Sequence, residues 1–256
     1  MILTSLLVGL ILMISRMSGM FSIIPVFSSR NIPAQAKIGL IFFTSYVMLP
    51  IVDLSYVEGI TTLLEMAYLI IIEFIIGLML GAVMQIALSC IYLAGTFIDR
   101  NTGFAMVSVV NPIGTEQLAV SANLLYVLAM ILFFVIDGHH QLIRVIARSY
   151  EVAPVGSGFI NLFVSLQLTD LMQEAFILGF KLAAPFIITV FIGNMLLGLL
   201  AKAMPGMNVF LLGLPFKVSI GFFLFVVLLS SYVDALTEVY GWIWEMLAKI
   251  MFFIKI

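Results

Sequence analysis

Residues 66–98 read MAYLIIIEFIIGLMLGAVMQIALSCIYLAGTFI, and Glu73 is the single charged residue among them. A helix needs about 20 consecutive apolar residues to cross the hydrocarbon core of a bilayer. This stretch exceeds that length with one ionisable interruption. It predicts a long membrane helix, and the remainder of the chain is interpreted around it.

The composition of the whole chain favours the same environment. Of its 256 residues, 64% are apolar or aromatic and only 9% are charged, whereas a soluble domain carries about 25% charged residues. A soluble fold of this length must cover a sizeable surface with polar groups. The 22 Phe, the 16 Met and the long aliphatic runs exclude that arrangement. The solvent must be lipid, other apolar protein, or both.

Several classes of function are excluded by the same inventory. A net charge of −2 without a basic cluster gives no electrostatic basis for binding nucleic acid. Cys90 is the only cysteine, so the chain can form neither an internal disulfide nor a cysteine-rich metal site. No phosphate-binding loop, zinc-protease motif or nucleophile elbow occurs in the sequence. We therefore expect no enzyme activity and no cofactor.

Charges and helix breakers divide the chain into six candidate apolar helices and a tail. The helices cover residues 2–27, 38–52, 66–98, 117–136, 170–201 and 218–233, and the tail covers 235–256. The first has no basic residues before it and no convincing cleavage site after it, so we expect it to be retained. None of the connections is long enough for a soluble domain. The sequence predicts an all-α integral membrane protein, a single domain over 1–256 with a separate C-terminal helix.

Lys and Arg in the short loops normally set the orientation of a membrane protein. With six alternating spans, one side would hold Arg16, Arg30, Lys37, Arg100, Lys202 and Lys217. The other side would hold Arg144, Arg148, Lys181, Lys249 and Lys255. This balance gives no orientation. Either the helices are not simple spans, or partners position the protein.

Small and polar residues recur every four positions in the helix 66–98. They are Glu73, Gly77, Gly81, Gln85 and Ser89. An ionisable group at bilayer depth costs at least a few kcal/mol unless it has a partner, so this face should contact protein. The two glycines permit close approach of another backbone, and the Gln85 amide can bond across the contact. Packing within the chain and packing against another subunit are both open, and a proton relay is disfavoured because no second acid accompanies Glu73.

In segment 170–201, Asp170, Glu174 and Lys181 share one stripe. Pro185 cannot donate to the carbonyl of Lys181, which predicts a kink beside a buried cation. The kink is either a functional hinge or a site where Lys181 pairs with Glu174 in a packed interface. We favour the paired interface.

Adjacent His139 and His140 raise the question of a metal site. Neighbouring residues on a helix point about 100° apart and cannot easily share one ion. No other histidine exists in the chain to complete a site. With Asp137 and Gly138, they are expected to form a polar cap after helix 117–136, and no metal site is predicted.

The connection from Asp99 to Glu116 is unusual. Its ends are loop-like, but residues 104–110 form an apolar run that would be a liability in water. Irregular backbone at membrane depth is tolerated only inside protein or beside a cavity. The sequence therefore predicts a re-entrant or pore-occluding segment.

Four groups of residues form a recognisable series. They are residues 94–105 (AGTFIDRNTGFA), Asn111-Pro112, Gly138-His139-His140, and residues 204–210 (MPGMNVF) with Gly213, Pro215 and Lys217. Arg16, Pro25, Asn31-Ile32-Pro33 and Lys37 fit the same series at the N-terminus. In order and spacing, this pattern resembles the FliR family of flagellar biosynthetic proteins over essentially the whole chain. It departs from that family at Arg100-Asn101, where Gln-Met is usual, and at Gly206, where Gln is usual.

The resemblance implies a core subunit of the flagellar type III protein export gate, in the bacterial inner membrane and the flagellar basal body. The implied partners are FliP, FliQ and FlhB, and the implied cargo is unfolded flagellar protein. The helices would pack in a helical hetero-oligomeric assembly, with membrane lipid meeting only part of the apolar surface.

Two sets of site residues follow from the motifs and the resemblance together. The loop of about 103–116 would plug the closed pore through Gly103, Phe104, Met106, Val107, Val109, Val110, Pro112 and Gly114. Subunit packing would use Glu73, Gly77, Gly81, Gln85 and Lys181.

Three alternatives stand beside this interpretation. The export proteins of virulence injectisomes are relatives, and the M-N-V-F and G-H-H blocks favour the flagellar branch. An autonomous proton-coupled transporter could use Glu73, Asp99 and Lys181 at broken helices, but the chain has no obvious internal repeat and few intramembrane charges. An intramembrane enzyme lacks a convincing nucleophile, base or metal set.

Overall fold

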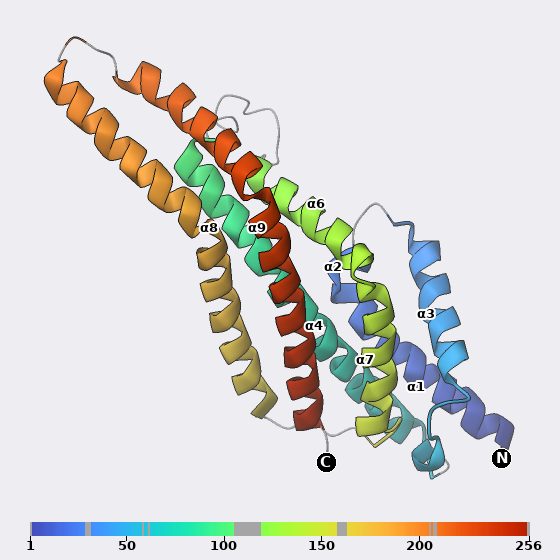
Figure 1. Ribbon diagram of the computed structural model, residues 1–256. Helices are drawn as coiled ribbons and strands as arrows, with labels where there is room; N and C mark the ends of the chain where they lie inside the picture. The colour runs from blue at the N-terminus through green and yellow to red at the C-terminus, as the bar shows by residue number, and fades with distance from the viewer. Residues whose placement is uncertain are drawn as a thin grey trace. The chain divides into compact units, whose positions relative to one another are not determined.

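The structure is a computed structural model that describes residues 2–28, 32–57, 59–60, 62–104, 119–157, 163–204, 206 and 209–254. Within these ranges every regular element is helical (Figure 1). The helices are α1 (Ile2–Ile23), α2 (Pro25–Ser28), α3 (Ala34–Met48), η1 (Ser55–Val57), α4 (Leu63–Thr102), α6 (Val120–Val135), α7 (Gly138–Val152), α8 (Phe163–Ala203) and α9 (Val209–Ile254). The prediction of an all-α protein is confirmed.

Four of the described helices are long and apolar enough to cross a membrane. They comprise Ser5–Ile23, Leu63–Thr102, Gln167–Ala203 and Leu212–Phe252. The bent pair of α6 and α7 adds a fifth candidate if it counts as one span. Helix α3 has 15 residues, fewer than the about 20 that a span needs. The chain is therefore a multi-pass membrane protein, and its described residues contain four or five candidate spans, fewer than the six used for the charge count.

Besides shifts of helix ends, the structure differs from the sequence-based expectation in α7 and α9. The predicted sixth helix and C-terminal helix are one continuous helix, α9. The charge of Asp234 does not break a helix, and residues 222–240 contain neither glycine nor proline. The connection after Asp137 holds helix α7, whose buried Leu142, Ile146 and Tyr150 recur every four residues on a largely polar segment.

The chain divides into two compact units. One comprises Met1–Ala87, Phe134–Met172 and Gly241–Ile256, and the other comprises Leu88–Phe133 and Gln173–Tyr240. All of these boundaries fall inside helices, namely α4, α6, α8 and α9. The division is therefore not made by a flexible linker.

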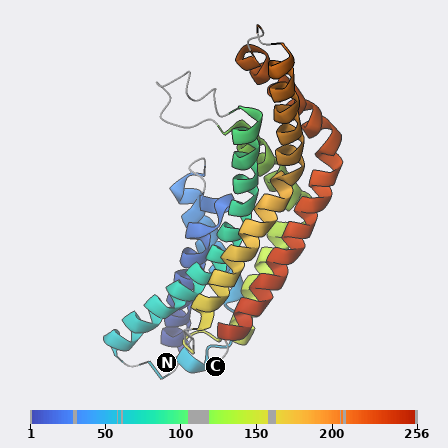
Figure 2. The ribbon, with the colours of Figure 1, turned by 90° about the vertical axis from the view of Figure 1, so that its left-hand side faces the viewer.

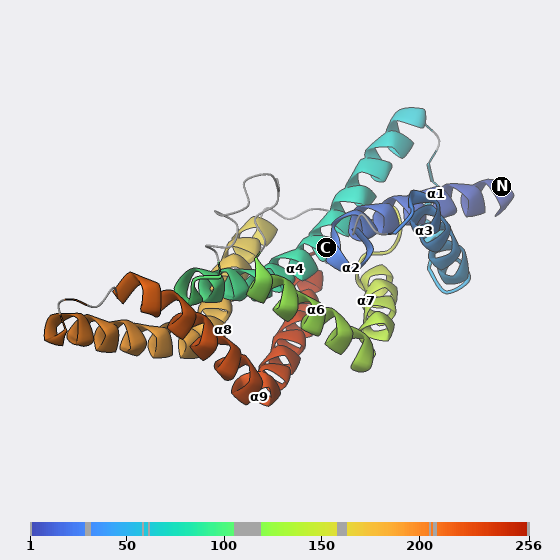
Figure 3. The same cartoon turned by 90° about the horizontal axis from the view of Figure 1, so that it is seen from above.

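Backbone contact between α1 and α4 organises the first unit. A Cβ atom on Gly77 would overlap the carbonyl oxygen of Arg16, and one on Gly19 would overlap that of Phe74. A Cβ on Gly81 would lie 2.8 Å from the carbonyl oxygen of Met20. Glycine thus lets the two helices approach closely, as the G-x-x-x-G pair predicted. Helix α3 packs beside α1 in the same unit (Figure 3).

Tyrosine hydroxyls connect the helices of the second unit. The Tyr240 hydroxyl donates to the carbonyl of Ala129 at 2.6 Å, and the Tyr232 hydroxyl donates to the carbonyl of Leu182 at 2.6 Å. Helices α8 and α9 run side by side (Figure 2). Helix α8 changes direction near its middle in Figure 1, and Pro185 lies inside this helix. This arrangement agrees with the predicted proline kink.

Replacing Gly77 with Ala tests the contact between α1 and α4. The added methyl group collides with backbone, which cannot rotate away as a side chain can, so overpacking should cost about 1–3 kcal/mol. We expect a lower midpoint of thermal unfolding for the detergent-solubilised protein. Gly39→Ala on α3 is the control, because a Cβ there meets nothing within 4 Å and alanine favours a helix. Equal midpoints for the two variants would contradict the close approach.

Candidate functional site

Asp99 joins the end of α4 to the beginning of α6. Its side chain is 3% exposed. The carboxylate oxygen Oδ1 accepts a hydrogen bond from the Ser121 amide at 2.9 Å, and Oδ2 accepts one from the Ala122 amide at 3.5 Å. The first amides of a helix lack an intrahelical acceptor, and a carboxylate there also complements the positive end of the helix dipole. Asp99 therefore caps α6 from another helix.

The contact between α4 and α6 explains the residue types at positions 94–99. A Cβ atom on Gly95 would overlap the backbone of Ala122, so only glycine allows α4 to approach α6 here. Ala94 and Ile98 are fully buried. Asp99 lies one turn after Gly95 and reaches the same turn of α6. The motif combines a close approach, a packed face and a cap.

The predicted pore plug begins directly after this junction. Gly103 has φ of +87°, a conformation that favours glycine. Phe104 is 7% exposed, and its ring centroid lies 5.5 Å from that of Phe222 on α9 in an edge-on contact. The other predicted plug residues, Met106, Val107, Val109, Val110, Pro112 and Gly114, lie outside the described residues. The structure thus shows how Phe104 and the beginning of α6, the described residues on either side of this stretch, are held.

Arg16 and Glu73 form a buried ion pair in the first unit. The Arg16 Nε donates to the Glu73 Oε2 at 2.6 Å, and the two side chains are 2% and 0% exposed. Glu73 therefore has the partner that its position in an apolar helix requires. The pair links α1 to α4 across 57 positions of sequence.

The remaining hydrogen-bonding groups of this pair are also satisfied. Arg16 Nη1 donates to the Ser149 carbonyl at 3.1 Å, and Nη2 donates to the Ala153 carbonyl at 2.9 Å. The guanidinium carbon lies 4.3 Å from the ring centroid of Tyr150. The amide of Gly156 donates to the Glu73 Oε1 at 3.0 Å. A buried pair with its other bonds satisfied fixes one geometry, and this one joins α1, α4 and the end of α7.

The residues predicted for subunit packing fall into two groups in the structure. Glu73, Gly77 and Gly81 take part in the intramolecular contact with α1. Gln85 and Lys181 are exposed, so a role for these two in subunit packing stays a prediction.

The sequence predicts that Lys181 is a buried cation, and this prediction is wrong for the isolated chain. Lys181 and Glu174 are both exposed on α8, whereas Arg16 is the buried cation among the residues that the structure describes. The sequence contained a signal for Arg16, because it is the only charged residue before Arg30. Its partners, however, lie too far along the chain for a spacing argument to identify them.

Asp137, His139 and His140 lie where α6 gives way to α7. Asp137 has φ of 57°, and its carbonyl accepts hydrogen bonds from the His140 and Gln141 amides. One Asp137 carboxylate oxygen lies 3.2 Å from Nδ1 of His140. The possible metal-ligand atoms of the three residues lie within 4.8 Å of one another, closer than the helical angle between neighbouring residues implied. The contacts are those of a helix start, and the absence of a metal site stays a prediction.

These features define a helical, multi-pass membrane protein with buried polar junctions between its helices. Residues 7–241 match the family described as bacterial export proteins, family 1. This chain belongs to that family. Because the family consists of export proteins, the prediction that the chain is not an enzyme is confirmed.

Among the relatives of this chain are proteins named flagellar biosynthetic protein FliR from three different bacteria. That of Bacillus subtilis (strain 168) is 28% identical over 225 residues, covering 86% of this chain and 85% of the relative. That of Escherichia coli (strain K12) is 27% identical over 236 residues, covering 92% and 90%. That of Aquifex aeolicus (strain VF5) is 29% identical over 224 residues, covering 88% and 85%. The resemblance inferred from the motifs is confirmed.

Glu73→Gln tests the buried ion pair. The glutamine keeps the shape and an acceptor for the Gly156 amide, but it leaves Arg16 buried without an opposing charge. Removing one partner of a buried pair costs about 3–5 kcal/mol, so thermal unfolding in detergent should occur at a markedly lower temperature. Asp137→Asn is the control, because Asp137 and His140 form an exposed pair. An unfolding temperature within a degree of the parent for Glu73→Gln would refute the role of the pair.

Two substitutions at Asp99 separate capping from charge. Asp99→Ala removes the acceptor for the Ser121 amide, while Asp99→Asn retains a capping oxygen. A lost cap costs about 0.5–2 kcal/mol, so hydrogen exchange of the Ser121 and Ala122 amides should become faster by about an order of magnitude in the alanine variant and change little in the asparagine variant. Asp53→Ala is the control, because Asp53 accepts from the Ser55 amide at an exposed turn. Equal exchange in Asp99→Ala and the parent protein would exclude the cap.

Proposed function

We propose that this chain is a component of the flagellar export apparatus and, within it, a core subunit of the gate through which unfolded flagellar proteins leave the cell. The supporting observation is the family match over residues 7–241, together with relatives named FliR that align along most of their own length. The proposed location is the bacterial inner membrane at the flagellar basal body. The proposed partners are FliP, FliQ and FlhB.

The exposed apolar surface supports a role inside an assembly. Leu199 on α8 is 66% exposed and Val226 on α9 is 77% exposed. Phe42 and Phe43 on the short helix α3 are exposed as well. Large apolar patches mark contacts with protein or membrane, and α3 is too short to be covered by lipid as a span. Partner subunits and lipid together account for such a surface.

In the proposed mechanism the gate is passive, and the loop 103–116 seals the closed channel. The apolar side chains of this loop exclude water and ions when packed in the pore. Near its beginning the loop is held by the packing of Phe104 on α9, and after it the start of α6 is held by the Asp99 cap. A loop fixed at both ends can leave the channel and return to it, and Gly103, Pro112 and Gly114 permit that change of path. The chain has no nucleotide-binding motif, so the proton gradient and a separate ATPase subunit supply the driving force.

The structure weighs against an autonomous transporter as the alternative function. Two of the three coupling groups considered for it have structural partners, since Glu73 pairs with Arg16 and Asp99 caps α6. The third, Lys181, is exposed on α8. A proton-coupled carrier needs ionisable groups that change partners during the cycle. The relatives from Bacillus subtilis, Escherichia coli and Aquifex aeolicus all carry the flagellar name, which favours the flagellar branch over the injectisome.

Deleting residues 103–114 tests the plug. In cells that lack their own relative of this chain, the shortened protein should make the inner membrane leak small ions, measured as loss of membrane potential. A second pair of variants tests the apolar seal itself. Replacing Met106, Val107, Val109 and Val110 with Ser should cause the leak, and replacing them with Leu should not.

Assembly of the gate must be shown for each variant, by co-purification with FliP and FliQ. An intact ion barrier in an assembled gate without residues 103–114 would rule out the plug. Failure to co-purify with FliP and FliQ, for the unaltered chain, would rule out the proposed gate.

A further inference from the structure

We propose that the hairpin of α8 and α9 contains a hinge at Pro185, that the Tyr232 hydroxyl holds this hinge in one bend, and that the hairpin thereby positions the end of α4. The inference deepens the proposed function and rests on it, because the predicted plug begins where α4 ends. The contacts that carry the inference all lie within the second unit.

The hydrogen-bond ladder of α8 is interrupted at its kink. Pro185 has no amide to donate to the Lys181 carbonyl. The Thr189 hydroxyl donates to the Pro185 carbonyl at 2.8 Å, a type of bond that often bends helices. A hollow of about 160 Å³ adjoins this turn, and its lining includes Lys181, Pro185 and Tyr232. The hollow gives the bend room to change, which a closely packed turn would not.

The Tyr232 hydroxyl holds the kink from the other helix. It donates to the Leu182 carbonyl at 2.6 Å, within the turn that Pro185 interrupts. The Tyr232 side chain is 4% exposed, so water does not readily replace it. The ring of Phe186 lies 6.2 Å from that of Tyr232 and 4.7 Å from that of Phe225, measured between centroids. Because losing a buried hydrogen bond leaves an acceptor unsatisfied, the bond favours one bend of α8.

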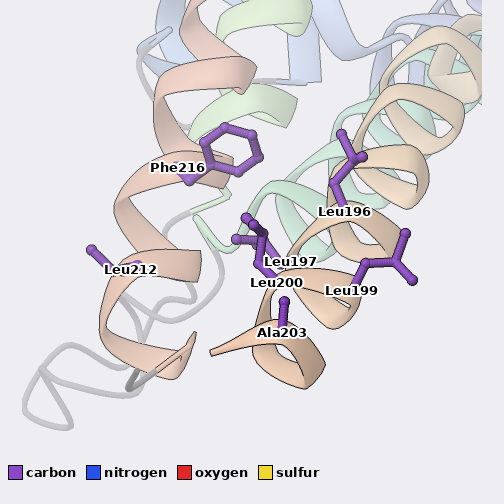
Figure 4. A pocket seen from close by; sticks show the side chains of 7 residues that line it. All are labelled: Leu196, Leu197, Leu199, Leu200, Ala203, Leu212 and Phe216. Atoms are coloured by element: carbon purple, nitrogen blue, oxygen red, sulfur yellow. The ribbon is translucent and has the colours of Figure 1, made fainter. Parts of the chain in front are cut away.

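Beyond the kink, the two helices of the hairpin enclose an open groove. It has a volume of about 640 Å³ and lies between Leu196 and Leu200 of α8 and Leu212 and Phe216 of α9 (Figure 4). At the kink, by contrast, three aromatic rings pack between the helices. The hairpin is thus closely packed around the hinge and open toward its tip, an arrangement that lets the bend change about one point.

The face of α9 that meets the kink also contacts the end of α4. Gly221, Phe225, Leu228 and Tyr232 follow one another at steps of four, three and four residues, so they share one face of the helix. A Cβ atom on Gly221 would lie 3.0 Å from Cγ2 of Thr102, the last residue of α4. Glycine at position 221 therefore lets α4 end directly against α9.

Helix α9 connects this contact rigidly to the hinge. It is continuous over Val209–Ile254, and Tyr232 follows Gly221 by 11 residues, a rise of about 16 Å. Phe104 lies edge-on against Phe222 beside the same contact. A change in the bend at Pro185 shifts α9 against α8, and the end of α4 and Phe104 must follow or lose their contacts. The hinge is therefore coupled to the residues that lead into the predicted plug.

Double electron–electron resonance on the purified full chain tests the hinge. Spin labels at Ile177→Cys and Leu199→Cys, two exposed positions on either side of the kink, report the bend of α8 in a Cys90→Ala background. Tyr232→Phe removes the hydroxyl and keeps the ring, so the distance distribution should extend toward the about 33 Å of a straight helix. The population outside the parent peak should rise about fivefold, the factor that corresponds to one neutral hydrogen bond.

Tyr240→Phe is the matched control for this measurement. The Tyr240 hydroxyl donates to the Ala129 carbonyl on α6 at 2.6 Å, so the substitution removes a bond of the same kind from the same helix, away from the kink. The distance across α8 should stay as in the parent. An unchanged distribution in Tyr232→Phe, or an equal change in both variants, would overturn the hinge.

The ion barrier of the assembled gate tests the coupling to α4. Gly221→Ala introduces a carbon 3.0 Å from the Thr102 Cγ2, so it should displace the end of α4 and speed the loss of membrane potential several-fold. Thr102→Ser removes that Cγ2 and keeps the hydroxyl, and adding it to Gly221→Ala should restore the barrier. Tyr232→Phe should also leak. Gly241→Ala should not, because a Cβ there meets nothing within 4 Å.

Co-purification with FliP and FliQ verifies assembly of each variant. A leak that Thr102→Ser does not reverse would overturn the contact between α4 and α9 as its cause. A gate that leaks without residues 103–114 but stays closed with Gly221→Ala and with Tyr232→Phe would overturn the coupling and leave the plug standing. A gate that stays closed without residues 103–114 would overturn the plug, and the role of the hinge in the gate with it.

Discussion

Burial of Arg16 is the constraint on which the first unit depends. A guanidinium group without water requires an opposing charge and acceptors for its remaining N–H groups. Glu73 supplies the charge, and the carbonyls of Ser149 and Ala153 supply the acceptors. These groups come from α4, from α7 and from the residue that follows α7. Satisfying one cation therefore dictates which helices meet, and the glycines of α1 and α4 allow them to meet closely enough.

Asp99 also links helices through a buried charge, but it does so by accepting hydrogen bonds from backbone amides. It also is a charged group inside an apolar protein, but its partners are the free amides at the start of a helix and not an opposite charge. Among the described residues, each unit thus has a buried carboxylate that links two or more helices. Non-directional apolar contact alone would let such helices slide past one another, because the lipid around them is equally apolar. The polar junctions fix the register.

Much of the fold could be predicted from the sequence because apolar length is a strong signal. The sequence predicts the long helix around Glu73 to within a few residues at each end. The glycine spacing predicts that another backbone approaches this helix closely, but it does not identify α1 as the partner. The sequence pattern does not predict a continuous α9, because a charged residue such as Asp234 ends an apolar run without ending the helix. The sequence pattern predicts a connection where α7 lies, because the many polar residues of this helix obscure the buried face of Leu142, Ile146 and Tyr150. Arg16 as the partner of Glu73 could not be derived, since spacing arguments reach only neighbours on one helix.

The ion pair also has a consequence for the order in which the protein is made. Arg16 is near the beginning of the chain, but one of its acceptors, Ala153, follows it by 137 residues. During synthesis α1 therefore enters the membrane before α7 exists, with a cation that still lacks some of its acceptors. Glu73 arrives first and neutralises the charge, and the carbonyls at the end of α7 complete the set much later. Helix α1 thus reaches its final environment only after α7 has been made.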